Sequence, residues 1–74
     1  MMYMGWQDTD KHRTTAAKLQ GALDRYMAKH GRPATVALLN PEQLATLGTA
    51  PLGVAVAPAA TVAVDVFLVG EVER

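Results

Sequence analysis

The chain has 74 residues, of which 50% are hydrophobic and 19% charged, with no cysteine and a formal net charge of zero. This composition excludes a disordered chain, a disulfide scaffold and a thiolate zinc site. A domain of this length buries only about 60% of its unfolded surface, so we expect it to gain stability as a homo-oligomer, with a dimer favoured.

The charges are divided unevenly along the chain. Residues 1–32 carry six cationic and three acidic side chains, whereas residues 33–74 carry one and four. The first part therefore has a net charge of +3 and the second of −3, which makes the molecule dipolar. Such a molecule could associate head to tail, or its basic half could face an anion.

Three segments are expected: an N-terminal arm (1–9), a single domain (10–70) and a C-terminal tail (71–74). The apolar start of the chain is too short for a signal peptide. Pro51, Pro58 and Asp65 interrupt the apolar run 50–69, which argues against a membrane-spanning helix. We therefore expect a cytoplasmic protein without membrane contact.

A long helix is predicted over residues 10–30. Asp10 or Thr14 can cap its start, and Gly31 and Pro33 end it. Apolar side chains with helical spacing mark one face, formed by Ala16, Leu19, Leu23, Tyr26, Met27 and His30. Cationic side chains lie on another face, at Lys18, Arg25 and Lys29.

A first strand is predicted over residues 34–39 and a short helix over 41–47. Asn40 stands in the N-cap position, Pro41 at the first helical position and Gln43 in the place of a capping-box glutamine. Gly48 is expected to end this helix.

Two more strands, over residues 53–57 and 61–69, are expected to form an antiparallel hairpin. The fold class is then a small α+β domain with the order α-β-α-β-β and a three-stranded sheet. Its third strand lies between the first two, which run parallel (order 1-3-2). The long helix covers one face of the sheet. The other face is apolar and needs cover from the short helix or a second subunit.

Asp65 is the unusual residue of the predicted third strand. Strict alternation places it on the same face as Phe67 and Val69. A carboxylate there must be paired, hydrogen-bonded or at a wet opening. Two interpretations remain: a structural acid that is partly solvated or paired with a basic residue such as Arg32, or an acid that binds a ligand or lies at an interface.

The cationic residues Lys18, Arg25, Lys29 and Arg32 form a candidate nucleic-acid-binding face, because phosphates attract such clusters. Asp24 interrupts this face, and the pI of about 6.7 is low for a nucleic-acid-binding domain. A solvated helix face is the simpler interpretation.

Nothing in the sequence indicates an enzyme, a cofactor or a metal site. His12 and His30 would lie about 27 Å apart along one helix, so they cannot share an ion within one chain. The glycines are scattered singly, and no phosphate-binding loop, nucleophile elbow or zinc-ligand pattern is present.

The leading hypothesis is a non-catalytic protein-interaction or assembly module that acts as a homo-oligomer. The open sheet face and an edge strand would be its contact surfaces. One alternative is an accessory nucleic-acid-binding protein that uses the basic face of helix 10–30. A second alternative is a small-molecule sensor with a site near Asp65.

Overall fold

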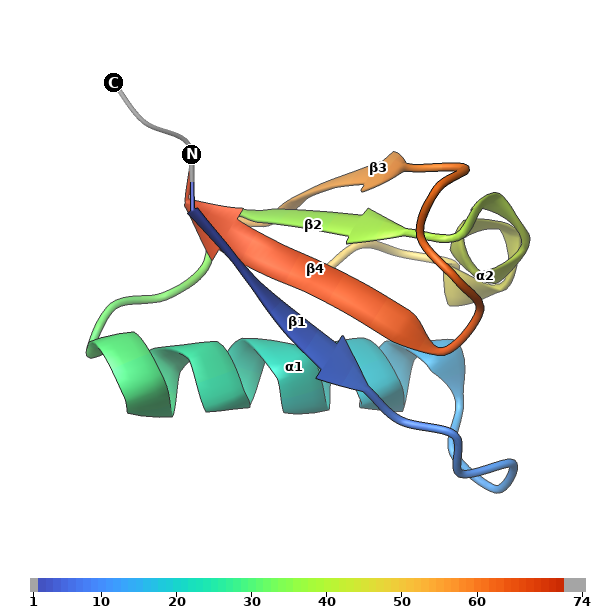
Figure 1. The fold of residues 1–74 in the computed structure, drawn as a ribbon, viewed down its shortest axis with the longest axis horizontal. Helices are drawn as coiled ribbons and strands as arrows, with labels where there is room; N and C mark the ends of the chain where they lie inside the picture. The colour runs from blue at the N-terminus through green and yellow to red at the C-terminus, as the bar shows by residue number, and fades with distance from the viewer. Residues whose placement is uncertain (1, 72–74) are drawn as a thin grey trace.

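The computed structural model describes residues 2–71, which form two helices and a four-stranded mixed sheet (Figure 1). The elements in chain order are β1 (Met2–Gln7), α1 (Thr15–His30), β2 (Val36–Leu39), α2 (Pro41–Leu47), β3 (Ala55–Pro58) and β4 (Val66–Glu71). The predicted α+β class is confirmed.

The strands lie in the order β1-β4-β2-β3. β4 is antiparallel to both β1 and β2, and β2 is parallel to β3. The last strand is therefore central and antiparallel to its neighbours, as predicted, and the parallel orientation of β2 and β3 is also confirmed. The predicted order 1-3-2 is wrong, because β2 and β3 pair directly and β4 lies between β1 and β2.

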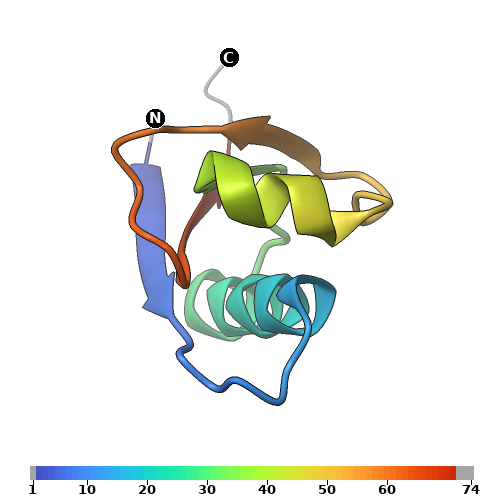
Figure 2. The ribbon, with the colours of Figure 1, turned by 90° about the vertical axis from the view of Figure 1, so that its right-hand side faces the viewer.

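The predicted hairpin is also wrong, since β3 and β4 are not neighbours in the sheet. The chain leaves β3 at one edge and passes the end of β2 before it enters the sheet as β4 (Figure 2). Residues 61–65 form this connection instead of the first half of a strand.

The N-terminal segment differs from the expected arm, because residues 2–7 form β1 and pair with β4 along its whole length. The predicted tail is corrected at Glu71, which ends β4. The remainder of that tail, residues 72–74, lies outside the described residues.

Both helices begin and end at local signals. The side chain of Thr14 accepts a hydrogen bond from Ala17 N (3.1 Å), so α1 starts after Thr14 rather than at residue 10. Gly31 adopts a left-handed conformation (φ 70°) and donates to Met27 O, which ends α1 where predicted. Asn40 caps α2 through Glu42 N (2.9 Å), and α2 spans the predicted residues 41–47.

The core lies between the sheet and both helices, which cover the same face (Figure 2). Its fully buried side chains are Leu19, Ala22, Tyr26, Ala37, Leu39, Phe67 and Val69. The buried stripe of α1 is rotated from the predicted one: Ala22 is inside, whereas Ala16 and Met27 are exposed. Neither helix of residues 2–71 lies over the opposite face of the sheet.

Candidate functional site

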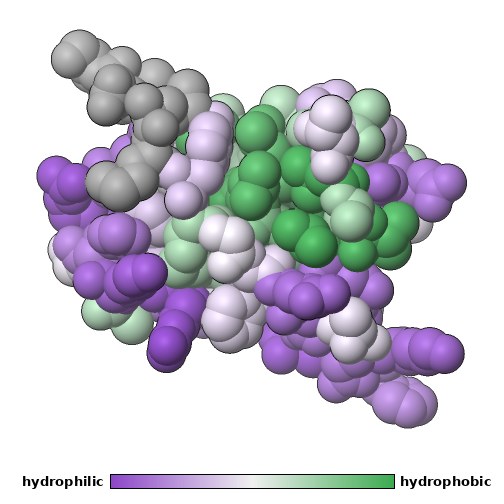
Figure 3. All heavy atoms as spheres, in the orientation of Figure 1, coloured by the Kyte–Doolittle hydropathy of each residue, from purple (hydrophilic) through white to green (hydrophobic). Residues whose placement is uncertain are grey.

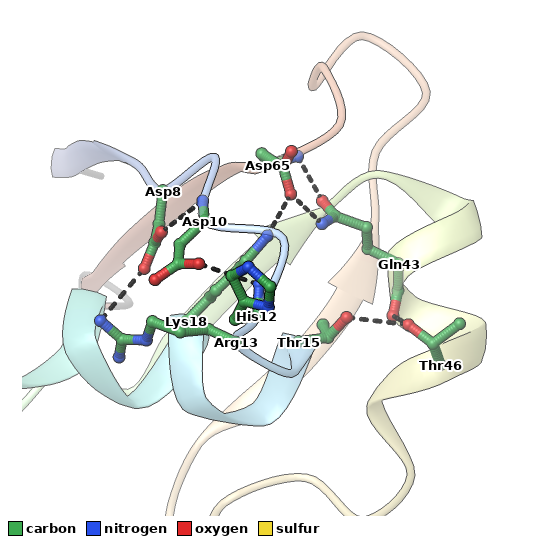
Figure 4. Close-up of polar contacts among 9 residues, drawn as sticks. All are labelled: Asp8, Asp10, His12, Arg13, Thr15, Lys18, Gln43, Thr46 and Asp65. Atoms are coloured by element: carbon green, nitrogen blue, oxygen red, sulfur yellow. Dashed lines mark hydrogen bonds and ion pairs between the residues drawn. The ribbon is translucent and has the colours of Figure 1, made fainter.

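Asp65 lies at the junction of several elements rather than inside a strand. It is the residue before β4, in a left-handed backbone conformation (φ 67°) that is uncommon for residues other than glycine. Its carboxylate oxygen Oδ1 accepts from Lys18 Nζ of α1 and from Gln43 Nε2 of α2, both at 2.8 Å (Figure 4). The sequence prediction of a strand position for Asp65 is therefore wrong, because the chain turns at this residue.

Backbone bonds complete this junction. Asp65 N donates to Gln43 Oε1 at 2.6 Å, so the two residues form a reciprocal pair. Asp65 O accepts from Asp8 N at the end of β1 (3.0 Å). We call Lys18, Gln43 and Asp65 the polar junction. It joins both helices to the start of β4, and through Asp8 to the end of β1.

The electrostatics of the polar junction favour the ionised acid. The hydrogen bond from Lys18 lowers the pKa of Asp65 below its ordinary value, against the opposing effect of partial burial. The side chain of Lys18 is only 8% exposed and that of Asp65 is 25% exposed. A cation this buried needs its partner, so the contacts account for Asp65 as half of an ion pair, with Lys18 rather than Arg32.

The sequence contained a signal for this pair. Lys18, Ala22 and Tyr26 are spaced four residues apart, so they lie on one stripe of α1. Gln43 was expected to complete a capping box with Asn40, but its side chain points to Asp65 instead. Lys18 can be buried because it pairs with Asp65, which lies 47 residues away in the sequence.

Burial of Lys18 divides the predicted basic face. Arg25 and Lys29 are exposed, and Arg32 forms an ion pair with Glu71 (Nε to Oε1, 3.2 Å). Arg25 and Lys29 therefore remain together on the surface of α1, whereas Lys18 is buried. Nucleic-acid binding through the remaining cations stays a prediction.

Glu71 is a second polar centre, which the sequence analysis missed because it placed this residue in a tail. Its Oε1 accepts a hydrogen bond from Tyr26 OH (3.1 Å) and forms the ion pair with Arg32. Burial raises the pKa of Tyr26, and the hydrogen bond to Glu71 raises it further. These contacts fix the end of β4 to α1 and to the segment after it.

The helix-free face of the sheet is mainly apolar. Alternation along the strands places one set of side chains there, and we call its half-buried apolar members the open-face patch: Leu38, Ala57, Val66 and Leu68. Leu38 and Leu68 lie directly opposite each other in the β2–β4 register. Figure 3 shows hydrophobic side chains gathered over β2, β4 and the connection from β3 to β4, with hydrophilic residues around them.

The free edge of β3 is poorly suited to strand pairing. Ala55 N and Ala59 N donate to β2 or its flanking residue, at Thr35 O (2.9 Å) and Leu39 O (2.8 Å). The alternate nitrogens, of Val56 and Pro58, therefore face away from β2. Proline has no N–H, so Val56 alone offers a donor along this edge of the strand.

Three hollows on the described part of the surface have volumes of about 450, 490 and 440 Å³, and Asp65 lines none of these three. The first lies between α1 and the turn 51–54, beside the exposed side chains of Met27 and Leu52. The second lies between β1 and α1 and includes Arg25 and Lys29. The third lies at the start of α2.

Within residues 2–71, no three histidine, cysteine or acidic side chains are grouped closely enough to hold a metal ion. Neither described helix is long and apolar enough to cross a membrane. Comparison of the chain with protein-family models, with curated proteins and with solved structures found no match.

Proposed function

We propose that this chain is a non-catalytic assembly module that forms a homodimer through the open-face patch. The observation that carries the proposal is the position of both described helices on one face of the sheet, which leaves the half-buried apolar side chains of the open-face patch without a helix over them. An apolar surface of this kind costs free energy in water and is typical of a contact site.

The shape of the patch supports face-to-face packing of two copies. Leu38 and Leu68 form its centre, on the two adjacent strands β2 and β4. A two-fold axis through this centre would bring the same residues of both copies together, as in most homodimers. Two sheets pack about 10 Å apart through such side chains. The polar junction and Glu71 are occupied by contacts within the chain, so they support stability rather than catalysis.

Solution mass tests this proposal. Light scattering over a range of concentrations should give the mass of two 7.9 kDa chains. Leu68→Lys should shift the mass to one chain, because a charge in the centre of the patch cannot be buried without a partner. Leu68 is half-buried on the open face, so the isolated domain should tolerate this change and retain a cooperative thermal transition.

Leu52→Lys is the matched control. Leu52 is fully exposed at the turn 51–54, away from the strands that carry the patch. This variant should keep the mass of the unaltered chain. A single-chain mass for the unaltered protein at micromolar concentration, or equal effects of both lysine variants, would contradict the proposal.

A further inference from the structure

The outer edge of β1 is open to strand pairing, unlike that of β3. Asp8 N donates to Asp65 O, which sets the phase of the antiparallel ladder between β1 and β4. In such a ladder alternate residues bond to the neighbouring strand, so Met4 and Trp6 direct their backbone groups to β4. Tyr3, Gly5 and Gln7 then direct their N–H and C=O groups away from the sheet, and none of them is proline.

A hollow of about 490 Å³ with two cations lies beside this edge. It is lined by Met4, Gly5 and Trp6 of β1 and by Arg25, Ala28 and Lys29 of α1. Arg25 and Lys29 are one helical turn apart, and neither has a carboxylate partner among the residues that the structure describes. The helix side of the β1 edge therefore carries uncompensated positive charge.

From these two observations we infer that the outer edge of β1 binds an extended segment of a partner protein as a fifth strand, with acidic side chains towards Arg25 and Lys29. The backbone groups of Tyr3, Gly5 and Gln7 supply the ladder. Alternate side chains of the bound segment face the hollow, where the two cations select carboxylates. The other side chains of the bound segment lie on the helix-free face of the sheet, next to Gly5 of β1.

Charge distinguishes this occupant from a second copy of the chain. Antiparallel pairing of two β1 edges, about a two-fold axis perpendicular to the sheet, would place both α1 helices on the same side of the joined sheet. Arg25 and Lys29 of both copies would then approach each other, and like charges disfavour such an arrangement. A nucleic acid would meet the two cations, but it has no peptide groups to pair with the backbone of β1.

The test uses the whole chain and a capped synthetic peptide of about six residues in which glutamate and valine alternate. Trp6 is the only tryptophan of the chain and lines the hollow, so its fluorescence reports binding. The peptide should bind at least about tenfold more tightly than a peptide of alternating lysine and valine. Two further peptides carry N-methyl groups on one or the other set of alternate backbone nitrogens. The peptide whose methyl groups lie on the edge that faces β1 should not bind.

Variants of the chain locate the site. Gly5→Pro removes a central outward N–H and should weaken binding by about tenfold or more, whereas Gly5→Ala should not, because its Cβ would lie 3.7 Å from Leu68 Cδ2 in ordinary contact. Lys29→Gln should weaken binding, and Lys11→Gln, an equal change of charge at an exposed turn residue, should not.

The N-methylated peptides keep the test decisive if Gly5→Pro disturbs folding, because they leave the protein unchanged. Equal binding of the methylated and unmethylated peptides would overturn the proposal, as would equal binding of the glutamate and lysine peptides. A single-stranded oligonucleotide that binds through Arg25 and Lys29 more tightly than the acidic peptide would also overturn it.

Discussion

Lys18 Nζ lies 2.8 Å from Asp65 Oδ1, and this ion pair joins the first turn of α1 to the residue that precedes β4. The sequence places Lys18 in a candidate nucleic-acid-binding face and Asp65 in a candidate ligand or interface site. In the structure they satisfy each other, and Gln43 completes their hydrogen bonding from α2.

Removal of either partner should destabilise the chain, with a larger effect for Asp65→Ala than for Lys18→Met. Lys18 is the more buried partner, so loss of Asp65 leaves a buried cation without compensation. Alanine is also poorly suited to the φ of 67° at this position. Denaturant unfolding of both single variants and of the double variant measures the change in the free energy of unfolding.

The double variant should lose less stability than the sum of the two single variants, because the second change removes a charge that the first left unpaired. Strict additivity would show that Lys18 and Asp65 do not interact. Asp65→Asn separates charge from conformation, since asparagine tolerates the left-handed backbone and can still accept from Lys18.

Stability should fall as the pH decreases below about 4, the ordinary range of an aspartate pKa. The pKa of Asp65 is lowered in the folded state, so its contribution is complete above its unfolded pKa. The contribution is lost as the pH falls through the unfolded and then the folded pKa. Asp65→Asn should show a shallower loss over this range in urea titrations at several pH values, and an unchanged slope would contradict the assignment.

Gln43→Ala should destabilise the chain by about 1–3 kcal/mol, since it leaves Asp65 N and one bond to the carboxylate unsatisfied. Gln20→Ala is the matched control, because Gln20 is exposed on α1. The control should change the free energy of unfolding by less than about 0.5 kcal/mol. Similar values for the two variants would indicate that Gln43 has no structural role.

Gly21→Ala should stabilise the chain by about 0.5–1 kcal/mol, because alanine favours the interior of a helix over glycine. The new Cβ would lie 3.4 Å from the flexible end of Arg13 and 3.7 Å from Trp6 Nε1. Both contacts can be accommodated. Thermal unfolding of the variant provides the measurement, and a lower melting temperature would mean that β1 requires the glycine for close approach to α1.

The helices were predictable because their signals are local. Thr14 and Asn40 each cap a helix within three residues of their own position, and Gly31 closes α1 through Met27. The alternation of Val66 to Val69 is likewise a property of the strand itself, and it correctly places Phe67 and Val69 on one face, which the structure buries in the core.

The strand pairing was less predictable because it depends on distant residues. β1 contains methionine and glycine, which are weak strand signals, and it becomes a strand by pairing with β4 at the other end of the chain. Residues 61–64 have the composition of a strand, but Val62 is buried in the connection between β3 and β4, and Asp65 has a left-handed backbone conformation. The local strand propensity is not realised there, because the chain must pass the end of β2 before it enters the sheet as β4.

The proposed contact between open faces can be tested directly by isotope-filtered nuclear Overhauser measurements on a mixture of labelled and unlabelled chains. The account predicts intermolecular signals from the methyl groups of Leu38 and Leu68, which lie opposite each other at the centre of the open-face patch. Intermolecular signals that arise only from Leu52 and Met27, or none at millimolar concentration, would contradict it.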